Sequence, residues 1–435
     1  MKTNKNMLCL VVMLLMTSVV YSQTDSLNSY MIIAAHNNPK VKAAYSDYLA
    51  SIQRVIPAGQ LDDPELSFSF YTKPMEQVNG KQVASVSFMQ MFPWFGTLKA
   101  AKLEKSWMAQ AKYQKYRIVG IEIAFSVQKL WYAMLSVHEQ IDAINDNIRL
   151  LKSLEEVSLY MYKSPSAMYG KGNGMSGGNR MSDQLRIQVE ENKLAEQKEN
   201  AKSQFDLMKR QFNILLHRDE NIAIAIPDTI SESLKPNLNI EDIERHNPVL
   251  SMQKAEGQSY VAQREMAKKM GMPMIGTGLE YMFNKKRDGM SDGVMSNMNG
   301  MDMLAVMFKV SVPIYRKKIR AQQKAAKLME DNANESYVAI IDEIQSQYDD
   351  IMRRLDEAKR NIKLCDTETH ILSKTVQLMH TEYTNGLSSI TDILQTQQTL
   401  IDFSLKRFDA VAEYNTAIAE LEKLAATNDY SINNK

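Results

Sequence analysis

Residues 38–71 read NPKVKAAYSDYLASIQRVIPAGQLDDPELSFSFY, and residues 247–281 read NPVLSMQKAEGQSYVAQREMAKKMGMPMIGTGLEY. Each copy begins with Asn-Pro, continues as a helical stretch and ends near a proline, after which apolar and polar residues alternate as in a strand. Similarity between two stretches of this length indicates a structural unit that occurs twice in the fold. The chain is therefore built from a duplicated unit.

A second alternating segment follows in each copy and leads into a long helix. The two segments are VASVSFMQMF at residues 83–92 and MLAVMFKVSV at residues 303–312. Pro93 and Pro313 stand just after them, where a missing N–H does no harm because the first donors of a helix lack partners within the helix. No proline interrupts residues 97–163 or 316–384. At 1.5 Å per residue, each helix could extend roughly 100 Å.

These patterns divide the chain into a signal peptide, two repeats, a linker between them and a short tail. The signal peptide is residues 1–22, the first repeat 23–220, the linker 221–239, the second repeat 240–427 and the tail 428–435. We expect strands at about 65–73, 83–92, 274–284 and 303–312, and long helices at about 97–163, 182–216, 316–384 and 388–427. Lys2 and Lys5 precede an apolar run that is typical of export signals and too short to anchor the chain in a membrane.

The alternating segments have the length and the two-faced pattern of tilted membrane strands. In the last of them, one face holds Leu304, Val306, Phe308, Val310 and Val312, and the other holds Met303, Ala305, Met307, Lys309 and Ser311. Four strands cannot close a barrel, and hydrocarbon does not tolerate unpaired strand edges. We therefore expect an α+β membrane protein in which three chains supply the strands of one barrel, about twelve in all. A soluble four-stranded sandwich is the alternative.

Composition and motifs argue against nucleic-acid binding and against catalysis. The chain has 52 basic and 51 acidic side chains, so it carries no net field that attracts nucleic acid. Cys9 lies in the signal peptide, which leaves Cys365 without a partner for an internal disulfide. The GMSGG stretch at residues 174–178 fits the nucleophile-elbow pattern but lies in a glycine-rich loop, not between a strand and a helix. We expect neither enzyme activity nor a cofactor.

Five motifs, taken in order and in duplicate, resemble the TolC-like outer-membrane efflux protein family. They are NPKVKAA, DPELSFSFY, QMFPWFGTLK, the second-copy NPVL with VSVPIYRKKI, and YTNGLSSITDILQTQ. The resemblance covers nearly all of the mature chain, from about Ser29 to Thr427. The stretch QMFPWFG is most similar to members associated with heavy-metal efflux.

The resemblance implies a homotrimer with a twelve-stranded barrel in outer-membrane lipid, continued by a periplasmic α-helical barrel. It also implies a location in the outer membrane of a Gram-negative bacterium, and passive conduction of small toxic compounds or of Cu(I) and Ag(I). The implied partners are a periplasmic adaptor protein and an inner-membrane efflux pump. An exit duct of a type I protein secretion system shares this architecture. A periplasmic coiled-coil scaffold is the alternative from another class, since helical pattern alone does not exclude it.

The same resemblance implies that the helix-hairpin turns form the periplasmic entrance of the pore. The residues that match the family's entrance motif are Tyr383, Gly386 and Asp392. Gln395 stands where the family often has a second acid, and Asp183 occupies the place of Asp392 in the first copy. A threefold ring of Asp392 would bring carboxylates together and hold cations. The alternative is an acid that interacts favourably with the dipole at a helix N-terminus.

Thirty methionines are far more than an average composition supplies, and they cluster in polar segments. Met290, Met295, Met298 and Met301 lie in the loop between two expected strands, and Met168, Met175 and Met181 lie in the stretched hairpin turn. Thioethers are soft ligands that favour Cu(I), and by extension Ag(I), over hard cations. These residues are therefore candidate metal ligands, with biased loop composition as the alternative.

Overall fold

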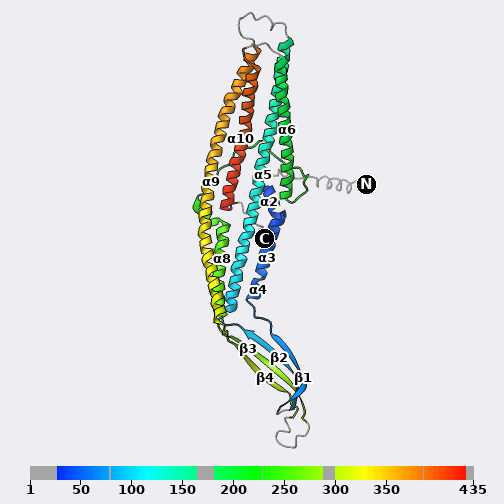
Figure 1. The fold of residues 1–435 in the computed structure, drawn as a ribbon, viewed down its shortest axis with the longest axis vertical. Helices are drawn as coiled ribbons and strands as arrows, with labels where there is room; N and C mark the ends of the chain where they lie inside the picture. The colour runs from blue at the N-terminus through cyan, green and yellow to red at the C-terminus, as the bar shows by residue number, and fades with distance from the viewer. Residues whose placement is uncertain are drawn as a thin grey trace, which may run out of the picture. The chain divides into compact units, whose positions relative to one another are not determined.

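The computed structural model describes residues 27–77, 80–163, 181–227, 229–287, 299–385 and 387–427 (Figure 1). The expected signal peptide, the turn from Ser164 to Arg180 and the tail at residues 428–435 lie outside the described residues. The helices are α2 (Leu27–Asn37), α3 (Pro39–Gln53), α4 (Val55–Ala58), α5 (Thr97–Lys163), α6 (Met181–Leu215), α7 (Ile240–His246), α8 (Pro248–Lys269), α9 (Arg316–Thr384) and α10 (Ile390–Ala425). The strands are β1 (Glu65–Gln77), β2 (Gly80–Phe92), β3 (Met274–Lys285) and β4 (Met303–Ser311).

The first hairpin is longer than its sequence pattern indicated. β1 extends to Gln77 and β2 begins at Gly80, whereas alternation placed the end of one strand near residue 73 and the start of the next near residue 83. The ladder continues because Gln77 pairs with Gly80, and its side chain donates to that of Gln82 over 2.7 Å. A register shift between Phe70 and Met75 breaks the alternation of apolar and polar residues. The alternation alone therefore places the end of β1 too early.

The two long helices, α5 and α9, contain 67 and 69 residues. Both run without proline, and packing of their apolar positions stabilises them more than intrinsic propensity does. Each is followed by a return helix, α6 or α10. Ser389 caps α10 at its start, where its hydroxyl accepts a hydrogen bond from the backbone of Thr391. The chain thus forms two long helical hairpins.

The chain divides into two compact units, and neither unit coincides with one sequence repeat. The first takes residues 1–42, 119–247 and 344–435, and the second takes residues 43–118 and 248–343. Each unit therefore draws on both repeats. The second contains the strands and the helical segments next to them, and the first contains both hairpin ends.

In the first unit, apolar residues from α5, α6, α9 and α10 form one core near the hairpin ends (Figure 1). The buried members are Ile144, Leu151, Leu154, Ile187, Leu194, Tyr383, Ile390, Ile393 and Ile401. The linker is tied to this unit as well. Asn415 of α10 accepts from the backbone of Ser233 over 2.7 Å and donates to the carbonyl of Ser231 over 2.8 Å. The linker is therefore attached to α10 at residues 231 and 233, while most of its other described residues are exposed.

The two Asn-Pro motifs have the same structural role. The side-chain amide of Asn38 donates to the carbonyl of Leu215 at the end of α6, and that of Asn247 donates to the carbonyl of Leu424 near the end of α10, both over 2.9 Å. In each case donor and acceptor are 177 residues apart. The last carbonyls of a helix lack partners within the helix, so each asparagine satisfies one of them. The sequence duplication is thus repeated in the hydrogen bonds.

In the second unit, side-chain contacts join the helices in pairs. Tyr48 of α3 lies with its ring 5.2 Å from that of Tyr113 of α5. Arg264 of α8 forms an ion pair with Glu330 of α9 over 2.8 Å. Next to these helices, the four strands form one antiparallel sheet in the order β1-β2-β3-β4 (Figure 1).

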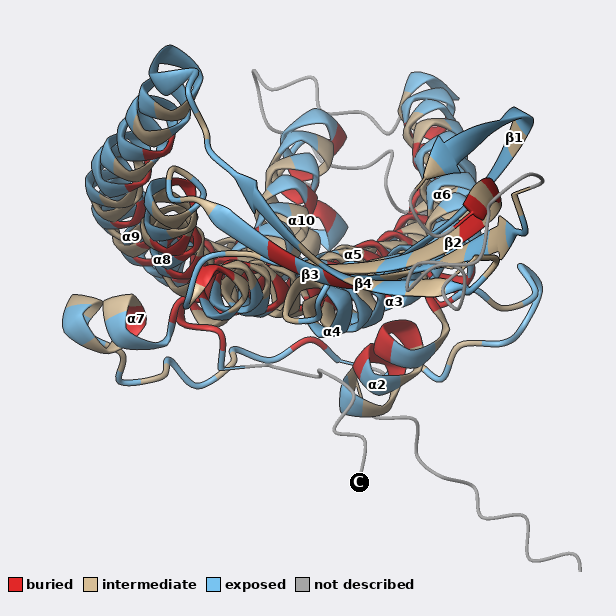
Figure 2. Ribbon diagram, turned by 90° about the horizontal axis from the view of Figure 1, so that it is seen from below, coloured by how far each residue is buried: buried red, intermediate tan, exposed pale blue. Residues whose placement is uncertain are grey.

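The register assigns each strand residue to one of two faces. We call the first the apolar face; it holds Leu66, Phe68, Phe70, Val86, Phe88, Ile275, Leu279, Tyr281, Phe283, Leu304, Val306, Phe308 and Val310. The other, the polar face, holds Ser67, Ser69, Ser85, Ser87, Met89, Met91, Gly276, Gly278, Glu280, Met282, Met303, Ala305, Met307 and Lys309. Figure 2 shows the sheet from below as a curved band whose residues are largely exposed, with buried positions on β2 and β3.

Candidate pore entrance and membrane sheet

Tyr383 lies in the last turn of α9 and is buried, with 3% of its surface exposed. Its hydroxyl donates to the hydroxyl of Ser158 on α5 over 3.3 Å, which ties the two hairpins together. Burial raises the pKa of Tyr383; the hydrogen bond with Ser158 opposes that rise, and the negative charge of Asp183 adds to it. Tyr383 therefore contacts the core at the hairpin ends and does not face solvent in the single subunit.

Asp392 and Asp183 occupy matching places, each in the first turn of a return helix. Asp392 and Gln395 are exposed on α10, and Asp183 is half-buried on α6. Gly386 lies outside the described residues. The negative charge of Asp183 thus acts on Tyr383, whereas Asp392 is exposed at the surface of α10.

Two partners in this region were not expected from the sequence, namely Ser158 and Arg186. Arg186 of α6 donates to the hydroxyl of Thr391 on α10, one residue before Asp392. Arg186 follows Asp183 by three residues, so helical spacing puts it on the same side of α6. That spacing was the available signal for Arg186; for Ser158 there was none, because its partner is 225 residues away.

Of the candidate metal ligands in the loops, only two lie within the described residues. Met181 begins α6 and Met301 precedes β4, and both are exposed. Met168, Met175, Met290, Met295 and Met298 lie outside the described residues. In the part of the chain that the structure describes, no three His, Cys, Asp or Glu residues come together as metal ligands.

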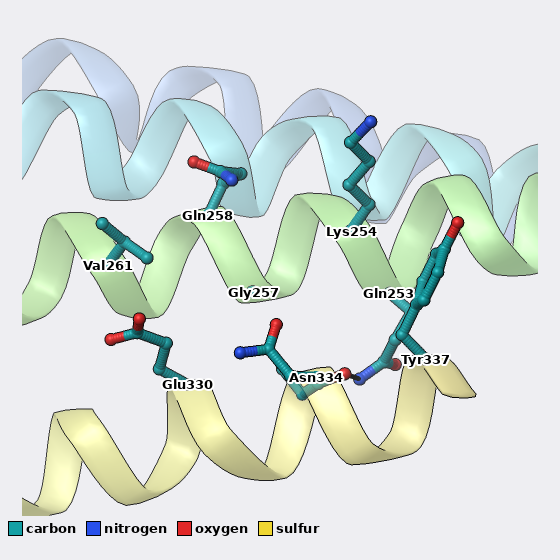
Figure 3. A pocket seen from close by; sticks show the side chains of 9 residues that line it. Gln253, Lys254, Gly257, Gln258, Val261, Glu330, Asn334 and Tyr337 are labelled. Carbon is teal, nitrogen blue, oxygen red and sulfur yellow. Dashed lines mark hydrogen bonds between the residues drawn. The ribbon is translucent and has the colours of Figure 1, made fainter. Parts of the chain in front are cut away.

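A pocket of about 430 Å³ lies between α8 and α9, and two of its polar side chains, Gln253 and Glu330, have partners (Figure 3). Gln253 donates to the carbonyl of Ala333 over 3.2 Å, and Glu330 is paired with Arg264 and Lys327. The groups that line it therefore hold two helices together. The pocket is therefore part of a polar contact between α8 and α9.

The sheet leaves large apolar side chains in contact with the surroundings. On the apolar face, Phe70 is 80% exposed and Phe308 is 77% exposed. On the same strand as Phe308, the polar-face residues Met303 and Met307 are half-buried. Exposed apolar area of this extent marks a membrane or protein contact rather than a surface in water.

The strand edges and the helices add to this picture. β1 and β4 stand at the two edges of the sheet, and each has one side without a hydrogen-bonded neighbour among the described strands. One apolar stretch, within residues 97–160 of α5, is long enough to cross a membrane by length and composition, but half of it is buried within the fold. That stretch therefore behaves as part of a helical core.

The fold is shared with solved channel structures. OprN, an outer-membrane channel, superposes with a TM-score of 0.75 at 12% identity, over 94% of this chain and 92% of that chain. CusC, whose structures concern transmembrane channel formation, superposes with a TM-score of 0.73 at 14% identity, over 92% of both chains. The outer membrane protein VceC of Vibrio cholerae gives 0.71 at 12% identity, over 92% of this chain and 96% of that chain. At these identities the likeness shows the fold alone.

No curated protein sequence matches the chain. A family model does: the one described as "Outer membrane efflux protein" matches residues 239–427. This match confirms the resemblance that the motifs indicated, and with it the expected location in the outer membrane and the absence of enzyme activity, since members of the family are passive conduits. The model of the outer membrane efflux protein family thus matches residues 239–427, and the fold of solved outer-membrane channels extends over the first half of the chain as well.

Proposed function

We propose that the chain is the outer-membrane channel subunit of a tripartite efflux system and works as a homotrimer. The observation that carries this proposal is the four-stranded sheet with two open edges and an exposed apolar face. Open edges are not tolerated in hydrocarbon, so a membrane sheet of this size needs strands from other copies. A periplasmic adaptor and an inner-membrane pump would supply the substrate and the energy.

The strand directions support closure by identical chains. Because the four strands are antiparallel in chain order, β4 of one copy and β1 of the next run in opposite directions. Copies can therefore be joined into one continuous antiparallel sheet, and three copies give about twelve strands, an even number within the known range. In this arrangement the apolar face contacts lipid and the polar face lines the pore.

Three finer assignments belong to the same proposal. The repeats at residues 23–220 and 240–427 each supply one hairpin and two strands, with residues 1–22 as export signal, 221–239 as linker and 428–435 as tail. Tyr383, Gly386, Asp392, Gln395 and Asp183 form the periplasmic entrance. Cu(I) or Ag(I) is the substrate class that the methionines favour, because thioethers are soft ligands.

The two alternative functions, a periplasmic scaffold and a protein-secretion duct, differ from the proposal in the expected surface of the sheet or in the exported substrate. A periplasmic coiled-coil scaffold would leave Phe68, Phe70 and Phe308 in water, which is unfavourable for side chains of this size. An exit duct for protein secretion uses the same architecture. It differs in that deletion of the gene would block export of a secreted protein and leave tolerance to toxic compounds and metals unchanged.

Cysteine pairs across the proposed junction test the trimer. Phe68→Cys on β1, combined in turn with Val306→Cys, Phe308→Cys or Val310→Cys on β4, should give intermolecular disulfides in outer membranes, seen as dimers and trimers on a non-reducing gel. Within one chain β2 and β3 separate these strands, which puts them about 14 Å apart and beyond disulfide reach.

The matched control is Ser67→Cys combined with the same β4 variants. Ser67 lies on the polar face, so its thiol points away from the apolar-face thiols of β4. Two results together would overturn the proposal. Every pair that contains Phe68→Cys would remain monomeric after oxidation, and the purified protein would be monomeric in water without detergent.

A further inference from the structure

Five methionines stand on the polar face of the sheet. They are Met89 and Met91 on β2, Met282 on β3, and Met303 and Met307 on β4. All are half-buried, although apolar residues next to them on the other face are exposed. If the polar face lines the pore, as the proposed function requires, these thioethers face the conducting path.

Two glycines of β3 open the space into which the sulfurs of Met89 and Met91 reach. A Cβ built on Gly276 would stand 2.5 Å from the Sδ of Met91 and 3.3 Å from the Sδ of Met89. A Cβ built on Gly278 would stand 3.1 Å from the Sδ of Met89. Both sulfurs therefore lie near the same point above β3, and any larger residue at Gly276 would displace one of them.

A third thioether lies across the same glycine. Gly278 pairs with Met89 on one side and with Met307 on the other. Strands on either side of β3 are about 10 Å apart, a gap that two methionine side chains can bridge when the residue between them has no side chain. Met307 is half-buried even though β4 is an edge strand. It is thus placed to approach the pair from the opposite side.

Charges around the three methionines offset one another. Lys309 pairs with Gly276, next to Met91, and is exposed. Glu65 pairs with Met89. Glu280 lies on the same face, two residues along β3 from Gly278. A monovalent cation above the glycines therefore meets no net positive field.

We propose that Met89, Met91 and Met307 form a binding site for a soft monovalent cation, Cu(I) or Ag(I), on the polar face of the sheet. Thioethers prefer these ions over hard cations. Being neutral ligands, they bind without first losing a proton, and a conduit needs sites that release what they bind. This proposal rests on the proposed function for the access of the ion. The competing explanation is that flexible methionines fill the space above two glycines.

Silver binding to the full mature chain in detergent tests the site, because Ag(I) needs no reductant. Met89→Leu combined with Met91→Leu should lose one bound Ag(I) per chain in equilibrium dialysis. The control pair is Met270→Leu with Met272→Leu, which has the same spacing in sequence, lies in the exposed connection before β3, and should keep that ion.

Gly276→Ala distinguishes a defined binding site from nonspecific binding of Ag(I) that depends only on the number of methionines. The added Cβ would displace the flexible Met91 side chain, whereas at Gly278 it would stand 2.5 Å from the backbone oxygen of Phe88 and disturb the strand pair. Gly276→Ala keeps every methionine, so it should weaken the strongest Ag(I) binding at least tenfold only if a built site exists. Silver X-ray absorption of the wild type should show sulfur neighbours that this variant loses.

Single-channel conductance in planar bilayers separates the two proposals. The site is overturned if the wild type and the double leucine variant have the same conductance and bind the same amount of Ag(I). It is also overturned if Gly276→Ala binds Ag(I) as the wild type does. In either case the methionines only fill space. A wild type without conductance would instead overturn the proposed function, whatever the silver result.

Discussion

At the scale of single residues, the clearest feature is a hydrogen bond that occurs twice. Asn38 and Asn247 each donate to a carbonyl 177 residues further along, at the end of a return helix. Two residues after each acceptor, His217 and Ala426 have φ of 54° and 53°, the left-handed conformation that ends helices. Both repeats therefore end their return helix in the same way, with a hydrogen bond from an asparagine that lies between two other helices and with a residue of left-handed φ.

Replacing either asparagine by alanine should destabilise the protein by about 1–3 kcal/mol, because a buried carbonyl loses its partner. Chemical unfolding in detergent, followed by helical circular dichroism, measures the change. Asn332→Ala, at an exposed position in the interior of α9, is the control and should be close to neutral. Equal effects of Asn247→Ala and Asn332→Ala would show that the repeated bond contributes nothing.

Ala426→Gly should raise the stability by about 1 kcal/mol, because glycine adopts a left-handed φ without the steric cost that a Cβ imposes. The adjacent Ala425→Gly should lower it by about the same amount, since residue 425 is still helical. The two substitutions remove the same methyl group from neighbouring positions. The same sign for both in thermal unfolding would contradict the assignment of Ala426 as the helix end.

At the scale of elements, the hairpins depend on contacts between helices that are far apart in the sequence. The bond from Tyr383 of α9 to Ser158 of α5 joins residues that are 225 positions apart, and both side chains are buried. The apolar residues around them come from all four long helices. The ends of the two hairpins are therefore packed together as one unit.

Tyr383→Phe should cost about 1 kcal/mol and leave the Ser158 hydroxyl buried without its partner. A double-mutant cycle with Ser158→Ala isolates the pairwise contribution, which should be about 0.5–1.5 kcal/mol. A coupling energy of zero would mean that the tyrosine only fills space.

The same variant has a pH dependence with a definite sign. Because burial raises the pKa of Tyr383 above its ordinary value of 10.0, the fold favours the neutral phenol. That contribution is fully present below pH 10.0 and is lost as the pH rises through the raised pKa. The stability advantage of wild type over Tyr383→Phe should therefore shrink above pH 10.0 in urea titrations. An advantage that is constant with pH would contradict the burial of the phenol.

At the scale of the whole molecule, the proposed function depends on copies of the chain that would complete the sheet and the entrance. Asp392 lies exposed in the first turn of α10 in a single chain. In a threefold assembly, three such carboxylates would come together and hold cations. Entrance and barrel would then both be products of association.

Asp392→Ala should remove block by multivalent cations or raise conductance in planar bilayers, because the proposed ring loses its charge. Asp402→Ala, exposed ten residues further along α10, removes the same charge away from the entrance and should leave both properties as in the wild type. Block that is identical in the two variants would assign Asp392 only a role at the helix N-terminus.

The residues of the proposed entrance could be named from the sequence, but their contacts could not. The motif around Tyr383 and Asp392 stands out beside the turn, and the equivalent Asp183 follows from the repeat. Ser158 and Arg186 were missed because hydrogen bonds between hairpins leave no local pattern. The alternation assigns Met303 and Met307 to one face of a strand, but only the register between β2, β3 and β4 places Met89 and Met91 beside the glycines of β3.

The sequence by itself determined the order of the elements, the two long helices, the two-faced strands and the duplication, since periodicity and proline placement act over neighbouring residues. The tertiary structure alone decided which hairpins pack together and that each compact unit mixes both repeats. It also decided that sulfur atoms of β2 lie above glycines of β3. These features depend on contacts between residues that are distant in the chain, which no local pattern encodes.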